Sequence, residues 1–155
     1  MTQYRIFPDD LTGTAVLDLL QLHLDEMHRW SPPQSVHAMP AERLRESDVS
    51  FFAAWDGETL AAVGALKEID ARRGELKSMR AVPEFRGKGA GEAILLHLLD
   101  EAMRRGYTWV GLETGGTPEF EPAVALYRKH GFADCAPFGN YVSDEFSRCM
   151  ELCLA

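Results

Sequence analysis

Apolar residues recur at helical spacing in several stretches of the chain, and signals for helix ends flank them. The first stretch follows Thr14, an expected N-cap, and stops at Ser31-Pro32-Pro33. Gly106 ends the stretch of residues 90–105 as a C-terminal cap. Glu121-Pro122 begins the stretch of residues 121–130 and places proline at the first helical position. The pattern therefore predicts long helices and one short helical turn, which cover residues 15–30, 41–46, 90–105 and 121–130.

Runs rich in β-branched and aromatic residues lie between these helices and predict strands. They cover residues 4–7, 49–55, 59–68, 75–82, 107–113, 132–136 and 146–154. Asp56-Gly57 is an expected hairpin turn, because both residues tolerate positive φ. The order β-α-α-β-β-β-α-β-α-β-β starts with hairpins, passes through a strand-helix-strand crossover and ends on an antiparallel pair. We expect an α/β (α+β) fold: a mixed, largely antiparallel central sheet of about seven strands with helices on both faces.

Length and cysteine usage narrow the class of protein. The 155 residues suit one domain, spanning 1–155, whose core needs no disulfide or metal. No apolar run approaches the roughly 20 residues of a membrane span, and the N-terminus lacks a secretory signal, so we expect a cytoplasmic protein without a membrane partner. Cys135, Cys149 and Cys153 lack metal-site spacing, and the last two are expected in the core.

Charge is distributed unevenly. The formal net charge is −8, which argues against a nucleic-acid partner, yet residues 72–88 hold six bases and two acids. A basic island in an acidic chain predicts one anionic ligand bound at one place, while the acidic remainder tolerates a cationic substrate such as an amine. A solvated charged hairpin would give the same pattern.

A glycine-rich loop follows the strand that ends at Pro83. The segment Arg86-Gly87-Lys88-Gly89-Ala90-Gly91 leads into a helix, whose first turn presents unpaired N–H groups, and such a turn binds pyrophosphate. A P-loop requires Ser or Thr after Gly-Lys, and here Gly89 follows Lys88. A dinucleotide fingerprint requires G-x-G-x-x-G in a first parallel βαβ unit, whereas these glycines are spaced G-x-G-x-G after a hairpin-rich half.

The same loop resembles motif A of the GNAT superfamily of acyl-CoA-dependent N-acetyltransferases, Arg/Gln-x-x-Gly-x-Gly/Ala. A second segment, Ala125-Leu126-Tyr127-Arg128-Lys129-His130-Gly131-Phe132, is similar to the family pattern A-x-x-L-Y-x-x-x-G-F. The two segments occur in the family's order, with a strand between them. His23, Ser31-Pro32, Ser35, His37 and Leu112-Glu113-Thr114-Gly115 also resemble an uncharacterised bacterial subgroup of that family.

The resemblance implies where a co-substrate would bind. Acetyl-CoA would lie between two splayed parallel strands, residues 75–82 and 107–113, with no metal required. Backbone groups of Met79, Arg80 and Ala81 would pair with the pantetheine arm and polarise the thioester carbonyl. The pyrophosphate would rest on the loop formed by Arg86, Gly87, Lys88, Gly89, Ala90 and Gly91.

The resemblance also implies roles for three side chains. Tyr127 would lie near the sulfur, contact the cofactor and protonate the departing thiolate, unless it is a core aromatic. Glu75, near the start of the cofactor strand, is the best-placed carboxylate to take the proton of the attacking amine, and Glu113, at the end of the facing strand, is the second candidate. A water relay is an alternative to either. The histidines His23, His28 and His37 are candidates to line the acceptor pocket. Specificity is expected from the loops 30–40, 115–119 and 138–141, and Cys135 shows no sign of activation.

Three functions remain open from sequence. The first is transfer of an acetyl group from acetyl-CoA to a primary amine of a small molecule or peptide, within a ternary complex. The second is a non-catalytic acyl-CoA-binding sensor or interaction module, and the third is a nucleotide-binding oxidoreductase. A homodimer is compatible with the sequence, which does not specify the oligomeric state.

Overall fold

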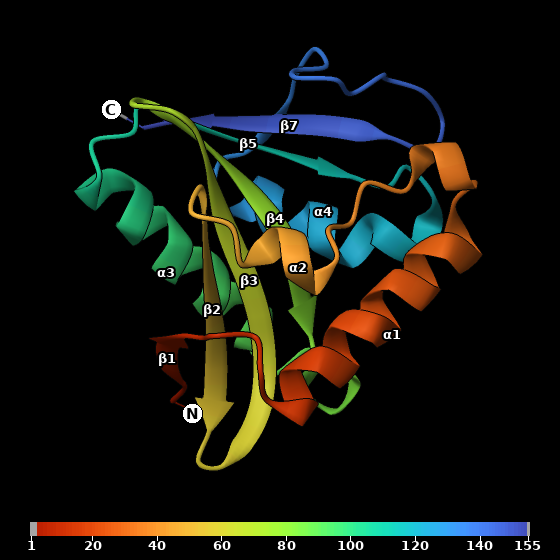
Figure 1. The fold of residues 1–155 in the computed structure, drawn as a ribbon. Helices are drawn as coiled ribbons and strands as arrows, with labels where there is room; N and C mark the ends of the chain where they lie inside the picture. Colours follow the sequence, from red (N-terminus) through yellow and green to blue (C-terminus); the bar gives the residue numbers. More distant parts are fainter. Residues whose placement is uncertain (1–2, 155) are drawn as a thin grey trace.

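The computed structural model describes residues 3–154, and Figure 1 shows their fold. Seven strands form one sheet in the order β1-β2-β3-β4-β5-β7-β6. The strands are β1 (Arg5–Pro8), β2 (Val49–Asp56), β3 (Thr59–Asp70), β4 (Arg73–Ala81), β5 (Trp109–Thr114), β6 (Ala133–Asp134) and β7 (Arg148–Cys153). Only β4 and β5 pair in parallel, and every other neighbouring pair is antiparallel. The predicted mixed, largely antiparallel α/β sheet is therefore confirmed.

Helices cover both faces of the sheet, as the sequence predicts. They are α1 (Thr14–Trp30), α2 (Ala41–Leu44), α3 (Ala90–Arg104) and α4 (Glu121–Lys129), with 3-10 turns at Pro33–Ser35, Pro83–Phe85 and Pro118–Phe120. In Figure 1, α1 and α2 lie in front of the sheet, and α4 lies behind it. Each face has its own apolar core: Ile94, Leu98 and Val124 belong to one cluster, and Val16 and Leu44 to the other. None of the helices described for residues 3–154 is long and apolar enough to cross a bilayer.

The two parallel strands, β4 and β5, pair along only part of their length and then diverge. Their paired register runs from Arg73 opposite Trp109 to Leu76 opposite Leu112 and stops there, although both strands continue. Figure 1 shows the divergence directly, since the β4 arrow points down and the β5 arrow points right. Beyond Leu76, β4 pairs with β3 alone, so its other edge keeps backbone groups without a strand partner.

A bulge in β4 sits just past the point of divergence. The pairing with β3 shifts between Val63 and Ala65, which leaves Ser78 and Met79 opposite Gly64. Ser78 has φ of 54°, a left-handed conformation that costs a non-glycine residue free energy. Gly64 makes room for the bulge, because a Cβ there would lie 2.5 Å from Ile94 Cγ2 and 2.7 Å from Met79 Sδ.

Two local predictions were wrong, and a third was displaced by one residue. Gly13, not Thr14, caps α1, and Thr14 is the first helical residue. The predicted hairpin between β2 and β3 is confirmed, with positive φ at Gly57, but it turns at Gly57 and Glu58, because Asp56 still pairs with Thr59. Cys149 is buried as predicted, whereas Cys153, the last residue of β7, is exposed.

Candidate active site

A cavity of about 600 Å³ opens where β4 and β5 separate. Its walls come from the second half of β4, the end of β5, the loop before α3, and α4. Residues of α1 and of the connection that follows α1 close the remaining side. The gap between the two parallel strands is thus one continuous cavity that reaches the glycine loop at one end and the α1–α2 connection at the other.

The glycine loop presents backbone donors at the start of α3. Gly87 and Gly89 have φ of 74° and 82°, and these left-handed conformations favour glycine because it has no Cβ. Within residues 3–154, no backbone carbonyl accepts the N–H groups of five residues: Gly87, Gly89, Ala90, Gly91 and Glu92. Five free donors at the positive end of a 15-residue helix dipole form a site for an anion of the size of a pyrophosphate.

The predicted phosphate residues do not all reach this cavity. Arg86, Gly87, Gly89, Ala90 and Gly91 line it, but Lys88 does not. The Lys88 ammonium lies 5.8 Å from the centroid of the Phe85 ring, and its backbone N–H donates to the Phe85 carbonyl. The half-exposed Arg86 guanidinium lies 3.4 Å from the Glu26 carboxylate of α1. Of the two cations predicted for the loop, Arg86 is therefore the one that lines the cavity.

The unpaired edge of β4 also faces the cavity. Met79, Arg80 and Ala81, predicted to contact a pantetheine arm through their backbone, all line it. The buried Arg80 guanidinium forms an ion pair with Glu26. This contact fixes α1 against β4, so the side of the cavity opposite α4 is held by an ion pair between the two elements.

Tyr127 lines the cavity from α4. Its side chain is buried, its ring centroid lies 5.7 Å from that of Phe132, and its hydroxyl has no hydrogen-bond partner within the described residues. Burial raises the pKa of Tyr127, so the phenol is neutral at physiological pH. A neutral phenol without a protein acceptor is available as a proton donor to a group in the cavity.

Of the two predicted carboxylates, Glu113 is the one that lines the cavity. Ser147 Oγ donates to Glu113 Oε2 over 2.7 Å. Burial raises the pKa of Glu113 to about 7, and the charge of Glu75 adds to this, although the Ser147 hydrogen bond and the Lys77 charge oppose it. A carboxyl group that titrates near neutral pH is suited to accept a proton during catalysis.

Glu75 is only 4% exposed and is not among the cavity-lining residues. It accepts a short hydrogen bond from the Tyr141 hydroxyl and lies 3.4 Å from Lys77 Nζ. Lys77 Nζ in turn donates to the Tyr141 hydroxyl over 2.6 Å. Glu75 is therefore held in a closed cluster with Lys77 and Tyr141, which we name the Tyr141 cluster.

The cavity brings together two of the three histidines singled out from sequence. His23 and His37 line it, whereas His28 is exposed on α1 and does not. Burial, and next the charge of Arg80, lower the pKa of His23 to about 4. Burial, and next the charge of Lys77, also lower the pKa of His37. Both rings are therefore neutral near pH 7.

Cys135 lies outside the cavity, and burial raises the pKa of its thiol to about 11. At physiological pH it is a thiol and not the thiolate that nucleophilic catalysis requires. This agrees with the sequence, which showed no activating setting for it.

Sequence reasoning missed several residues of the site. Glu26 was read only as part of α1, and Lys77 only as part of the basic island. Ser147 carried no signal at all. Tyr141 belongs to the loop 138–141, from which specificity was expected, but nothing in the sequence identified it as a partner of Glu75, 66 residues away. A search for hydroxyl-bearing residues in the last loop would have found it as one of several candidates.

Comparison with known proteins assigns the family. A model of the acetyltransferase (GNAT) family matches residues 16–132. The chain is 47% identical to an uncharacterised N-acetyltransferase of Bacillus subtilis, YsnE, over 88% of this chain and 90% of that protein. It is 44% identical to YedL, an uncharacterised N-acetyltransferase of Escherichia coli, over 97% of this chain and 95% of that protein.

A solved structure agrees with this at the level of fold. The crystal structure of a Bacillus subtilis acetyltransferase in complex with CoA superposes with a TM-score of 0.74 at 20% identity, covering 99% of this chain and all of that one. The chain therefore belongs to the GNAT family of acetyltransferases and is an acyl-CoA-dependent N-acyltransferase.

Proposed function

We propose that the protein transfers an acetyl group from acetyl-CoA to a primary amine of a small molecule or peptide, by direct attack within a ternary complex. One observation supports this most: the gap between β4 and β5 runs from the five free N–H groups of the glycine loop to Tyr127 and Glu113. We also propose that residues 1–155 act as one N-acetyltransferase domain in the cytoplasm. The family assignment argues against the oxidoreductase alternative.

The chain offers groups that fit each charged or polar part of acetyl-CoA. The glycine loop would hold the pyrophosphate through Gly87, Gly89, Ala90 and Gly91, with Arg86 adding charge. The unpaired edge of β4 beside Met79, Arg80 and Ala81 would pair with the pantetheine arm and polarise the thioester carbonyl. The CoA complex of the Bacillus subtilis protein supports this use of the fold.

The proposed reaction moves two protons. The amine nitrogen attacks the thioester carbon, so that a C–N bond forms and the C–S bond breaks. Glu113, ionised above pH about 7, takes the proton that the nitrogen loses. Tyr127 gives its proton to the departing sulfur and regains one from solvent. Holding both partners in one cavity makes the attack effectively unimolecular.

The test is release of free CoA thiol from acetyl-CoA in the presence of a panel of amines. Relatives indicate the breadth of the panel, since 34% and 28% identical proteins are an IAA acetyltransferase and a ribosomal protein bS18-alanine N-acetyltransferase. The panel should therefore include amino acids, small aliphatic and aromatic amines, and peptides with free N-termini. Amine-dependent thiol release supports the proposal. Thermal protection by CoA without turnover on any acceptor would favour the acyl-CoA-binding module instead.

Tyr127→Phe is expected to lower kcat by about 10² without changing the KM for acetyl-CoA, because it removes a proton donor and not a binding contact. The hydroxyl has no protein partner within the described residues, so thermal stability should barely change. Tyr107→Phe is the matched control: it removes a buried hydroxyl that donates to Glu68 outside the cavity. Equal kcat for Tyr127→Phe and the unaltered protein would assign Tyr127 to the core alone.

A further inference from the structure

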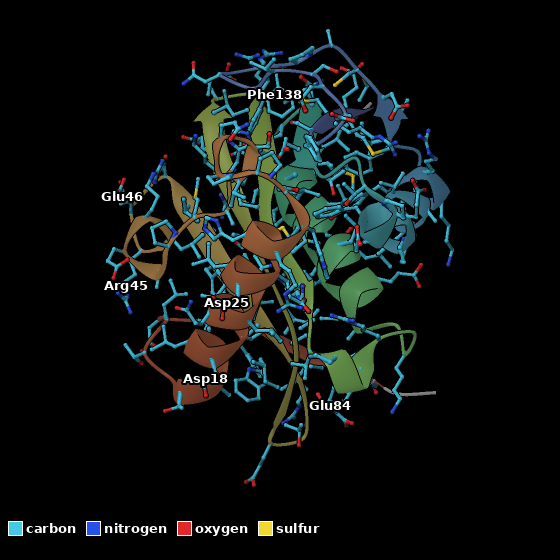
Figure 2. All side chains as sticks on the ribbon, turned by 90° about the vertical axis from the view of Figure 1, so that its right-hand side faces the viewer. Asp18, Asp25, Arg45, Glu46, Glu84 and Phe138 are labelled. Carbon is cyan, nitrogen blue, oxygen red and sulfur yellow. The ribbon has the colours of Figure 1, made fainter. Side chains whose placement is uncertain are left out.

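The connection between β6 and β7 returns across the sheet and delivers Tyr141 to β4. Two aromatic contacts and two hydrogen bonds hold it there. Its ring packs edge-on against Phe138 and His37, with centroids 5.3 Å and 5.0 Å apart. Its hydroxyl accepts from Lys77 and donates to Glu75. Figure 2 shows Phe138 near the top of the molecule and Glu84, close to the glycine loop, near the lower end. The Tyr141 cluster therefore lies at the end of the site remote from the phosphate loop.

Lys77 and Glu113 occupy matching positions on the two diverging strands. Leu76 and Leu112 are the last paired residues of β4 and β5, so Lys77 and Glu113 are the first residues beyond the pairing. Both line the cavity, on the face opposite to the leucines before them. Yet they form no ion pair. Lys77 is held by Tyr141 and Glu75, and Glu113 is held by Ser147. A partly buried cation and a partly buried carboxylate thus face one gap with separate partners.

We propose that Tyr141 is a positioning residue that holds the Lys77 ammonium on the Glu75 side of the gap, so that Glu113 keeps an unpaired carboxylate for the incoming amine. The inference deepens the proposed function and rests on it for the role of Glu113. The distances support the proposal that Tyr141, more than Glu75, holds the Lys77 ammonium in place. The phenol oxygen is the closer partner of Lys77, at 2.6 Å, while the Glu75 carboxylate is 3.4 Å away. Loss of the hydroxyl leaves the ammonium with one long contact and with Glu113 across the gap.

The charges around Glu113 determine how a movement of the Lys77 ammonium toward it would change its pKa. Glu75 and Lys77 face it from β4, Asp144 and Tyr141 from the β6–β7 connection, and Cys149 from β7. His37, from the α1–α2 connection, contacts Tyr141 and is neutral. Lys77 is therefore the only cation of this group, and it already lowers the pKa of Glu113 from its present position. If the ammonium moves closer, the carboxylate becomes a weaker base.

The experiment titrates the Glu113 side-chain carboxyl by NMR in protein labelled with 13C-glutamate, assigned with Glu113→Gln. No substrate is present, so the result does not depend on any acceptor. Tyr141→Phe should move the Glu113 midpoint down by about one pH unit, as expected for a cation brought within hydrogen-bond distance. Lys77→Met should move it up. The double variant should titrate like Lys77→Met, because the effect of Tyr141 acts through Lys77.

Phe138→Leu is the matched control, because it loosens the packing around Tyr141 without changing a charge or a hydroxyl. Its Glu113 midpoint should equal that of the unaltered protein. An unshifted midpoint in Tyr141→Phe, or an equal downward shift in the double variant, would overturn the positioning role. If the titrations behave as expected but no amine is acetylated, the proposed function fails and the inference about Lys77 stands. If activity is found, the acid limb of kcat/KM should follow the same shifts.

Discussion

Gly89→Glu is expected to abolish the protection that CoA gives the protein against heat. In the unaltered protein, CoA at about 100 times its Kd should add about 2.7 kcal/mol to the free energy of unfolding. For a chain of this size, that raises the Tm by roughly 5–10 °C. The variant places a carboxylate beside the free N–H groups that would hold the pyrophosphate. We expect at least a 100-fold weaker affinity and a ligand-induced Tm shift below about 2 °C, measured by thermal unfolding with and without CoA.

Gly106→Glu is a closely matched control at the other end of α3. Gly106 also has φ of 82°, and, as at Gly89, a Cβ there would meet no heavy atom within 4 Å. Both variants therefore incur a similar conformational penalty of about 1 kcal/mol, but only Gly89 lies in the cavity. Gly106→Glu should keep the full CoA-induced shift. If CoA raised the Tm of Gly89→Glu as much as that of Gly106→Glu, the glycine loop would not be part of the cofactor site.

The order of elements was predictable because periodic burial encodes it. The stripe Ile94, Leu95, Leu98, Leu99 and Ala102 identifies the buried side of α3, and all five side chains are buried. The bulge at Ser78 was not predictable, because serine is not a residue that signals positive φ. Its conformation follows from packing, since Met79 must fit against α3 where Gly64 leaves room. Local sequence does not contain that tertiary constraint.

The residues of the site likewise fall into two groups: those set by local sequence could be predicted, and those set by tertiary contacts could not. The glycine loop is a local structure, so its glycines and Arg86 could be identified from spacing alone. Lys88 was misplaced relative to the cavity, since its side chain turns toward Phe85 and spacing does not report side-chain direction. The Tyr141 cluster depends on a connection without periodicity that meets β4 more than 60 residues away. Choosing Glu113 over Glu75 required knowing where β4 and β5 separate, because Glu75 lies in the paired part of β4, opposite Gly111, and Glu113 lies just beyond the pairing.

Glu113→Gln is expected to lower kcat/KM for the acceptor by about 10²–10⁴, the usual contribution of a general base. The amide keeps the shape of the side chain and still accepts from Ser147, so the fold and the CoA-induced Tm shift should remain. The unaltered protein should gain activity as the pH rises through about 7, where Glu113 loses its proton. In the variant, this rise in activity near pH 7, the acid limb of the pH profile, should vanish. The remaining rate should rise only as the amine itself deprotonates. Steady-state rates between pH 5.5 and about 10 measure both effects.

Glu75→Gln tests the carboxylate that the sequence placed first as the proton acceptor, ahead of Glu113. Glu75 accepts from Tyr141 and lies outside the cavity lining, so its loss removes a charge that raises the pKa of Glu113. We therefore expect the acid limb of Glu75→Gln to move to lower pH while the limb itself persists. Disappearance of the limb in Glu75→Gln and its survival in Glu113→Gln would make Glu75 the base. Survival in both variants would instead assign the proton transfer to water, since neither carboxylate would then control the rate.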